Sequence, residues 1–369
     1  MGLRTREELE RAIDGDPYDA QLYAVLADLL QRDADPRGDL IALQLAAERN
    51  PELVGDAASC FKRHADRFVG ELAPIARDGN GETLRWRFGF IHGLRVQGDG
   101  GVPGPRSMAD KLARVRAHPS GRFVTELALG PSGFEDAELT AAIAALAAAP
   151  PRALRMLHFG CVPRRDPSLN FWHMGDALDG ILSVVPQLRR LVVNGGRYWV
   201  SSLDLPELRT LSFQIGGLNP TTARTIARAR LPKLTFLEVT GDHDDSIETL
   251  YIRNGRSTVS RTSGTFAHIA PLLVRTDLPN LRHLGIPKAL FTDEICAALP
   301  RAALLRQLEV LDLSHGFMTD DGARALAADP GAFSHLHRLD VSNNYLTRAG
   351  VAAVAGLARR VITSGQRRP

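Results

Sequence analysis

A short pattern of apolar residues recurs eight times between residues 124 and 341, and it constrains the fold more than any other feature of the chain. Each copy reads apolar residue, two residues, Leu, one residue, apolar residue; the copies begin at Val124, Leu154, Leu188, Leu208, Leu234, Leu281, Leu308 and Leu336. A unit this short cannot bury its apolar face alone, so neighbouring units stack into one continuous core. Stacked repeats expose a long surface in place of a single deep cleft, which favours binding of another macromolecule.

The two clearest copies are segments 308–314, LEVLDLS, and 336–344, LHRLDVSNN. Both resemble the leucine-rich repeat pattern L-x-x-L-x-L-x-x-N. The spacing of 27 residues from Leu281 to Leu308, and of 28 from Leu308 to Leu336, resembles the long repeats of the ribonuclease-inhibitor type. The resemblance implies an α/β solenoid with parallel strands on its concave side and one helix per repeat on its convex side.

Capping and apolar residues between the repeats predict these helices. Asp320 and Asp321 place carboxylates where a helix N-terminus favours them, and Thr347 is a typical N-cap residue. Leu139, Ile143 and Leu146 form an apolar stripe at helical spacing after the first repeat. We therefore expect helices that close the core on one side of the strands.

Two intervals between repeats are irregular. Leu188 and Leu208 are only 20 residues apart, too few for a strand and a full helix, so we expect an extended turn through 197–200. Leu234 and Leu281 are 47 residues apart, and the surplus falls at 242–264, where 249–259 predicts a hairpin around Asn-Gly. Whether this insertion binds a partner, is cleaved or is only a loop stays open.

Residues 5–75 read as helices that precede the repeats. Thr5 and Glu8 form the pattern of a capping box, and a turn is expected at 35–38, between the second and third helices. A fourth helix is expected from Ala57 to Leu72. The predicted domains are a helical domain at 1–80, a transition at 81–123, the repeat array at 124–358, and a basic tail at 359–369 that we expect to fray.

Two stretches of the N-terminal region resemble the bacterial "repeat-companion" domain. LADLL at 26–30 followed by DPRGDLIALQ at 35–44 is similar to its L-A-D-W-L and G-D-P-R-G-E-x-I-x-L-Q elements, with Leu29 in place of Trp and Asp39 in place of Glu. LRWRFGFI at 84–91 is similar to its W-x-x-G-F element. The resemblance implies a module that accompanies repeats and has no enzymatic activity.

Composition excludes several classes of protein. A net charge of +3, from 45 basic and 42 acidic residues, gives no general attraction to nucleic acid. The three cysteines, Cys60, Cys161 and Cys296, are far apart and odd in number, which argues against a disulfide framework. The sequence has no signal-peptide core and no stretch of about 18 apolar residues that would span a membrane. These features predict a cytoplasmic protein.

The sequence offers no catalytic, cofactor-binding or metal site. Neither a nucleophile elbow nor a phosphate-binding Gly-rich loop is present. His158, Cys161 and His173 lack the paired spacing of a zinc site. The acidic run 242–245 lacks the Gly and the distal Glu of a calcium loop.

In a repeat strand the leucines point inward, and the third and fifth residues of each copy point to the uncovered face. Because Arg and aromatic residues dominate interaction hot spots, we expect this face to bind a protein through Arg190, Phe236, Glu238, His283, Asp312, Arg338 and Asp340. The mixture of charges favours a protein surface over a phosphate backbone. Tyr198 and Trp199 are either exposed anchors or a plug that replaces the missing helix.

Together these features predict a non-enzymatic adaptor that is monomeric when free and binds a protein partner on the concave face. Two alternatives stay open: a regulatory or substrate-recognition subunit of a separate enzyme, or the substrate of a bacterial protease.

Overall fold

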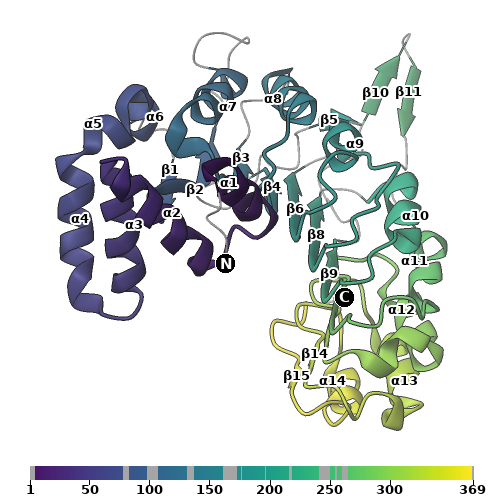
Figure 1. Cartoon of the computed structure of the whole chain (residues 1–369). Helices are drawn as coiled ribbons and strands as arrows, with labels where there is room; N and C mark the ends of the chain where they lie inside the picture. Colours follow the sequence, from purple (N-terminus) through teal and green to yellow (C-terminus); the bar gives the residue numbers. More distant parts are fainter. Residues whose placement is uncertain are drawn as a thin grey trace. The chain divides into compact units, whose positions relative to one another are not determined.

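A computed structural model describes residues 5–77, 83–97, 107–130, 137–160, 173–175, 177–195, 197–215, 218–240, 250–253, 256–259 and 265–367. The chain divides into two compact units, residues 1–165 and 166–369 (Figure 1). Both units combine helices with strands that are mostly parallel, so the predicted α/β class is confirmed. Each unit is described by itself below.

Helices open the first unit, as predicted. They are α1 (Arg6–Gly15), α2 (Ala20–Arg32), α3 (Pro36–Ala47), α4 (Val54–Arg63), α5 (Ala65–Phe68) and α6 (Ala73–Arg77), with single 3-10 turns at Pro51–Leu53 and Gly70–Leu72. The Thr5–Glu8 capping box is confirmed, since each residue's side chain accepts a hydrogen bond from the other's backbone N–H. The predicted fourth helix is wrong in its bounds, because α4 begins at Val54 and ends before His64.

The turn predicted at 35–38 is also wrong. Asp35 is the N-cap of α3 and accepts a hydrogen bond from the backbone N–H of Arg37, and Pro36 takes the first helical position, where its missing N–H has no cost. Gly38 is needed inside this helix, because a Cβ there would lie 2.7 Å from the carbonyl oxygen of Ala27. The Asp-Pro-Arg-Gly run therefore starts a helix that packs closely on α2.

The sheet of the first unit holds β1 (Thr83–Arg87), β2 (Phe90–Val96), β3 (Glu126–Leu129) and β4 (Met156–Phe159), in that order. The β1–β2 pair is antiparallel, whereas β2–β3 and β3–β4 are parallel. The helices α7 (Met108–Ala117) and α8 (Ala137–Ala148) follow β2 and β3. The predicted stripe of α8 is buried, with Leu139, Ile143 and Leu146 each 1% exposed.

Strands and helices alternate through the second unit. Its main sheet has the order β6 (Arg190–Gly195), β8 (Thr210–Ile215), β9 (Phe236–Val239), β12 (His283–Gly285), β13 (Val310–Asp312), β14 (Arg338–Asp340) and β15 (Val361–Ile362), and its helices are α9 (Ala177–Leu182), α10 (Pro220–Arg228), α11 (Phe266–Leu273), α12 (Thr292–Ala298), α13 (Asp320–Ala327) and α14 (Arg348–Val354). From α10 onward, the helices lie along one side of this sheet (Figure 1).

Each predicted repeat contributes one strand, and the strand begins at the third residue of the pattern. The copies starting at Leu281, Leu308 and Leu336 form β12, β13 and β14, which are adjacent and parallel, as predicted. The inward leucines of these three strands, Leu284, Leu311 and Leu339, are fully buried. The apolar period therefore sets both the register of the strands and the core beneath them.

The last three helices of the second unit, α12 to α14, are joined by one recurring contact. The carboxylate of Asp293 accepts hydrogen bonds from the backbone N–H (2.9 Å) and hydroxyl (2.6 Å) of Thr319, the N-cap of α13. Asp320 makes the same two contacts with Thr347, the N-cap of α14. A carboxylate at the start of α12 and one at the start of α13 thus each satisfy polar groups at the start of the next helix.

The short and the long interval between repeats both have the structure that their lengths predict. Between β6 and β8 the described residues form only β7 (Arg197–Tyr198), which pairs with β5 (His173–Gly175), and no helix. In the insertion, β10 (Leu250–Arg253) and β11 (Arg256–Val259) pair as an antiparallel hairpin, with Arg253 opposite Arg256. The remainder of 242–264 lies outside the described residues.

The prediction that the tail at 359–369 frays is wrong for the described residues, 359–367. Val361 and Ile362 form β15 and pair with β14 in parallel. Gln366 donates a hydrogen bond to the carbonyl oxygen of Val341 (2.9 Å), and the guanidinium of Arg367 lies 4.5 Å from the centre of the Tyr345 ring. Polar side chains thus fix a segment that contributes little apolar area.

Candidate protein-binding surface

The seven residues predicted to bind a protein fall on two neighbouring rows that cross the sheet of the second unit. The backbone register aligns the first row across β6, β8, β9, β12, β13 and β14 as Arg190, Thr210, Phe236, His283, Val310 and Arg338. The second row is Val192, Ser212, Glu238, Gly285, Asp312 and Asp340. Parallel pairing therefore brings together residues from positions 190 to 340.

These rows lie on the sheet face opposite the buried leucines. Side chains alternate between the two faces of a strand, and the leucines between the rows, Leu237, Leu284 and Leu311, are no more than 1% exposed. By contrast Arg190 is exposed, and the other six predicted residues are half-buried. The helices follow the opposite face (Figure 1), so this one remains accessible in the described part of the second unit.

An aromatic stack forms the centre of the first row. The rings of Phe236 and His283 are 4.0 Å apart between centroids and inclined by only 15°. A Cβ at Gly285 would lie 3.1 Å from Cγ of Glu238 and 3.5 Å from Nε2 of His283. Gly285 thus lets the Glu238 side chain lie close beside the stacked histidine.

Burial keeps the central histidine neutral. It lowers the pKa of His283 to about 4, the nearby Asp312 carboxylate raises that pKa and the Arg338 guanidinium lowers it. The Nε2 atom of His283 is buried and has no hydrogen-bond partner among the described residues, which disfavours a charged ring. At neutral pH this position therefore presents a flat aromatic surface, not a cation.

The second row carries three carboxylates, those of Glu238, Asp312 and Asp340, and each accepts a hydrogen bond from a nearby residue. Glu238 accepts a hydrogen bond from the amide of Gln214 (2.7 Å), and Asp312 accepts one from the backbone N–H of Ser314 (2.9 Å). Asp340 accepts hydrogen bonds from the backbone N–H (3.0 Å) and hydroxyl (2.7 Å) of Ser342. None of the three forms a salt bridge with another described residue, so their charges stay available to a partner.

Sequence reasoning missed the supporting residues of this surface. It considered only the third and fifth positions of each repeat, whereas Gln214 and Ser342 occupy the seventh position of theirs and hold Glu238 and Asp340. The sequence did carry a signal for these two residues, because the seventh position of both repeats is polar. The close approach at Gly285 had no comparable signal, because it depends on the Glu238 side chain of a neighbouring strand.

Of the two roles that the sequence left open, buried plug and exposed anchor, Tyr198 takes the first, whereas Trp199 is exposed. Tyr198 is fully buried and its hydroxyl donates a hydrogen bond to the carbonyl oxygen of Asn194 (2.9 Å). It is the plug of the short repeat. Trp199 is 49% exposed and is one of the few large apolar side chains of the described residues that face solvent.

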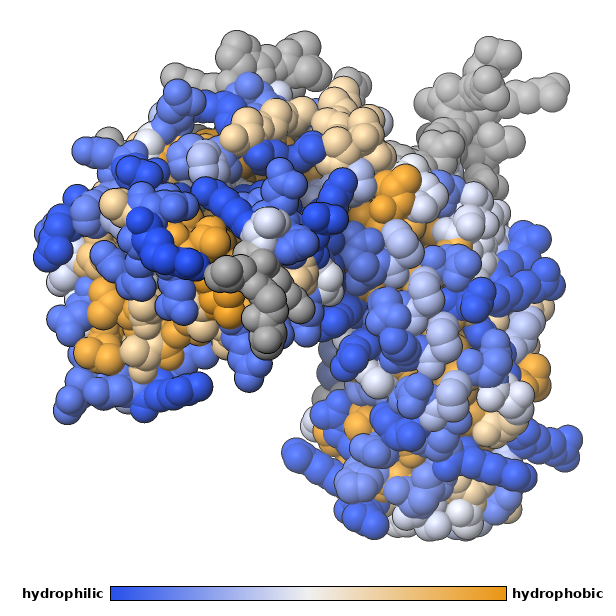
Figure 2. All heavy atoms as spheres, in the orientation of Figure 1, coloured by the Kyte–Doolittle hydropathy of each residue, from blue (hydrophilic) through white to orange (hydrophobic). Residues whose placement is uncertain are grey.

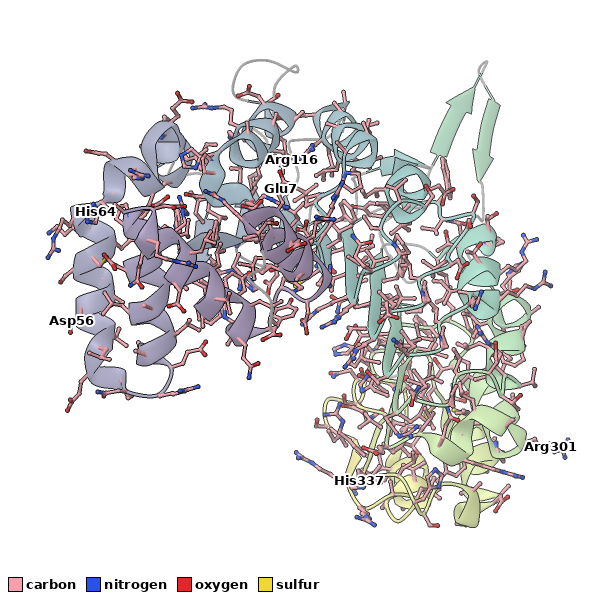
Figure 3. All side chains as sticks on the ribbon, viewed as in Figure 1. Glu7, Asp56, His64, Arg116, Arg301 and His337 are labelled. Carbon is pink, nitrogen blue, oxygen red and sulfur yellow. The ribbon has the colours of Figure 1, made fainter. Side chains whose placement is uncertain are left out.

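The first unit carries an open apolar hollow that the sequence did not predict. It measures about 540 Å³ and is lined by residues of α3, α4 and β1, among them Val54, Phe61 and Trp86. Figure 2 shows apolar residues gathered where α3 and α4 lie. Asp56 points outward from α4 (Figure 3), so this helix has one polar and one apolar side.

The described residues hold no group of three or more His, Cys, Asp or Glu side chains placed to bind a metal ion. Cys161, the His173 side chain and the run 242–245 lie outside them. Among the helices that the structure describes, none has the length and apolar character needed to cross a bilayer.

Comparison with known proteins supports the α/β fold alone. No family model and no curated protein matches the chain. A crystal structure of a Bacteroides fragilis protein, a target of the Northeast Structural Genomics Consortium, is similar with a TM-score of 0.60 and 20% identity, over 84% of this chain and 85% of that one. An identity this low carries no function from one protein to the other.

Proposed function

We propose that this protein is a leucine-rich repeat solenoid that acts as a non-enzymatic adaptor and binds a protein partner on the concave face of its sheet. The repeat assignment is supported by Asn344, the final residue of the L-x-x-L-x-L-x-x-N pattern in the last copy. Its buried amide donates hydrogen bonds to the carbonyl oxygens of Leu313 (2.9 Å) and Val341 (3.0 Å) and accepts one from the N–H of Met318 (3.0 Å). An asparagine at this position therefore satisfies backbone groups of two successive turns.

The N-terminal helices act as a cap on the first repeats in this proposal. Arg122 donates two hydrogen bonds of 2.9 Å to the carboxylate of Asp14 in α1. Arg155, next to β4, donates hydrogen bonds of 2.7 Å to the carbonyl oxygens of Asp14 and Gly15. These contacts, and a buried aromatic core that joins α2 to β2, support a shielding role, which terminal elements of a repeat array require.

The observation that carries the binding proposal is the stacked Phe236–His283 pair on an accessible sheet face, at the centre of a row that also holds arginines and beside a row that holds carboxylates. An aromatic centre with a charged surround is the usual composition of a protein interface. A nucleic-acid phosphate backbone would be repelled by Glu238, Asp312 and Asp340, so we propose a protein partner. Free, buried thiols at Cys60 and Cys296 are compatible with a cytoplasmic location.

Affinity capture from the host tests this proposal. The full chain is compared with the double variant Phe236→Ala/His283→Ala and with a control, Arg301→Ala/Arg306→Ala, whose residues are exposed on the helix side. We expect a protein retained by the wild type and the control and lost by the face variant. Retention by all three would refute binding through this face. A retained partner with an enzymatic domain would identify the chain as a recognition subunit.

A further inference from the structure

Three large apolar side chains occupy equivalent positions after successive strands of the second unit. Leu290, Phe317 and Tyr345 each lie seven residues after the first residue of β12, β13 and β14. Leu290 is 47% exposed, and the two aromatic side chains are half-buried. The backbone N–H of Phe317 donates to the carbonyl oxygen of Ala289 (3.0 Å), and that of Tyr345 donates to the carbonyl oxygen of Met318 (2.9 Å). The loops that carry the three side chains are therefore stacked, and the row they form is fixed.

A hollow of about 520 Å³ opens beside the two rings. It lies at the starts of α13 and α14, and its lining is Phe317, Thr319, Asp320, Asp321, Tyr345 and Thr347. The rings of Phe317 and Tyr345 are 5.1 Å apart between centroids and inclined by 39°. An aromatic surface thus lies next to two carboxylates and two hydroxyl groups.

The two rings already bind one guanidinium of this chain. The guanidinium of Arg367 lies 4.5 Å from the centre of the Tyr345 ring and 5.4 Å from that of Phe317. Arg367 does not line the hollow, so the hollow borders ring surface that this guanidinium leaves uncovered. Aromatic rings attract cations through their quadrupole, and arginine is the usual cation in proteins. The rings are therefore suited to a second guanidinium.

The hydroxyl groups of the lining have no proton to offer to a ligand. The hydroxyl of Thr319 donates to the carboxylate of Asp293 (2.6 Å), and that of Thr347 donates to the carboxylate of Asp320 (2.6 Å). The hydrogen bond from the Thr347 side chain lowers the pKa of the Asp320 carboxyl, which is therefore charged at neutral pH. A carboxylate has about four acceptor positions, so Asp320 can accept further hydrogen bonds.

The carboxylates select a cation over an anion. Asp320 and Asp321 occupy the first two positions of α13, where the N–H groups of the helix would otherwise favour a negative ligand. The Asp321 carboxylate pairs with Arg324, but the two side chains are 73% and 71% exposed, and such a pair contributes little stability. A metal ion would use the carboxylates and leave the rings unused. An arginine would use both, because its planar guanidinium stacks on rings and donates to carboxylates.

We infer that this hollow binds an arginine side chain of a protein partner, with its guanidinium against the rings of Phe317 and Tyr345. The N–H groups of the guanidinium face Asp320 and Asp321. An apolar residue of the same partner segment covers Leu290, one repeat away. The site shares no residue with the two rows of the sheet face, so it can be tested whether or not a partner binds that face.

Binding of short peptides to the full chain tests the inference. A blocked peptide of sequence Leu-Gly-Arg-Gly-Leu is compared with matched peptides that carry citrulline or lysine in place of arginine, and with N-acetylarginine amide. Citrulline keeps the shape of the side chain and removes its charge. The chain is labelled with fluorotyrosine, Tyr345→Phe assigns the resonance of Tyr345, and fluorine magnetic resonance follows its shift. We expect a saturable shift with a Kd on the order of 1 mM for the arginine peptide. The other three ligands should bind more weakly, the citrulline peptide by about tenfold.

Variants of the lining locate the site. Phe317→Leu keeps an apolar side chain but removes one aromatic face, and it should weaken binding of the arginine peptide by about fivefold. Asp321→Asn, at the surface, should weaken it by about two- to fivefold even if Phe317→Leu is unstable. Asp329→Asn makes the same change in charge at an exposed residue outside the hollow and should leave the affinity unchanged.

Three results would overturn the inference: no saturable shift of the Tyr345 resonance up to about 10 mM arginine peptide, equal binding of the citrulline peptide, or the same affinity for Asp321→Asn as for Asp329→Asn. Equal binding of the lysine peptide would refute the choice of arginine. Equal binding of N-acetylarginine amide would refute the partner segment and reassign the hollow to a small guanidinium compound.

Discussion

The guanidinium of Arg37 donates a hydrogen bond to the carbonyl oxygen of Gly89, 52 residues later in the chain. The same guanidinium donates to the hydroxyl of Ser120 (3.0 Å) and lies 4.7 Å from the centre of the Phe90 ring. Gly89 has a φ of +72°, and a Cβ there would lie 2.9 Å from Cγ of Arg37. The two stretches that resemble a repeat-companion domain therefore meet at this contact, which joins α3 to the β1–β2 hairpin.

Replacing Arg37 should destabilise the first unit. Arg37 is only 5% exposed, so Arg37→Met keeps most of its packing but leaves the carbonyl of Gly89 without its donor. We expect a loss of about 2–3 kcal/mol in the free energy of unfolding, measured by urea denaturation. The exposed Arg49→Met is the control and should be neutral. Equal stability of the two variants would show that the Arg37 contacts contribute nothing.

Loss of the carboxylate at Asp293 should loosen the packing of successive helices. Asp293→Ala removes the acceptor for the backbone N–H of Thr319, its hydroxyl and the N–H of Gly322. We expect a decrease of about 1–2 kcal/mol in unfolding free energy and faster hydrogen exchange at the start of α13. Asp329, exposed and without a side-chain capping bond, provides the control Asp329→Ala. No difference between the variants would contradict the proposed role of this carboxylate.

The titration of His283 should follow its burial. Its pKa of about 4 in the folded protein is below the ordinary value of 6.5, so the unfolded chain binds the proton more readily between these values. The contribution of His283 to stability is therefore complete above pH 6.5 and is lost as the pH falls toward 4. His283→Phe should remove this part of the pH dependence.

Nuclear magnetic resonance of the His283 ring protons measures the pKa directly. Arg338→Gln removes a cation and should raise the midpoint, whereas Asp312→Asn removes an anion and should lower it. A midpoint near 6.5 in the wild type would show that His283 is solvated and that the stacked arrangement is absent in solution.

Arg367 should stabilise the end of the second unit. Its Nε atom donates to the carbonyl oxygen of Asn343 (3.0 Å), and its guanidinium also lies 5.4 Å from the Phe317 ring centre. Arg367→Ala should cost about 1–2 kcal/mol in thermal or urea denaturation. The exposed Arg360→Ala is the matched control. An unchanged midpoint for Arg367→Ala would mean that the tail is fixed by β15 alone.

Much of the fold could be predicted because the repeat pattern consists of regularly spaced apolar residues. Each repeat strand begins two residues after the first residue of its pattern: β3 begins at Glu126, two residues after Val124, and β14 begins at Arg338, two residues after Leu336. The rows of the candidate surface follow from the same register. Their alignment required only that strands from successive repeats pair in parallel.

The rest depended mostly on contacts that no local pattern encodes. The run at 35–38 is compatible with a turn and with a helix start, since Asp is a common N-cap and Pro is favoured at the first helical position. Tertiary contacts of Arg37 with residues 89 and 120 hold the helix that starts at Pro36. The C-terminal residues lack an apolar period, and their polar contacts to Val341 and Asn343 had no signal in the sequence. Likewise, Tyr198 became a plug because a short repeat left room for its ring.

The affinity of the captured partner for single variants of the sheet face tests the central claim most directly. The claim predicts that Phe236→Ala raises the Kd by roughly tenfold or more, as expected for a hot spot. Arg301, which points outward on the helix side (Figure 3), is the control, and Arg301→Ala should change the Kd by less than about twofold. A Kd that stays within twofold for Phe236→Ala, His283→Ala and Arg338→Ala alike would contradict the claim.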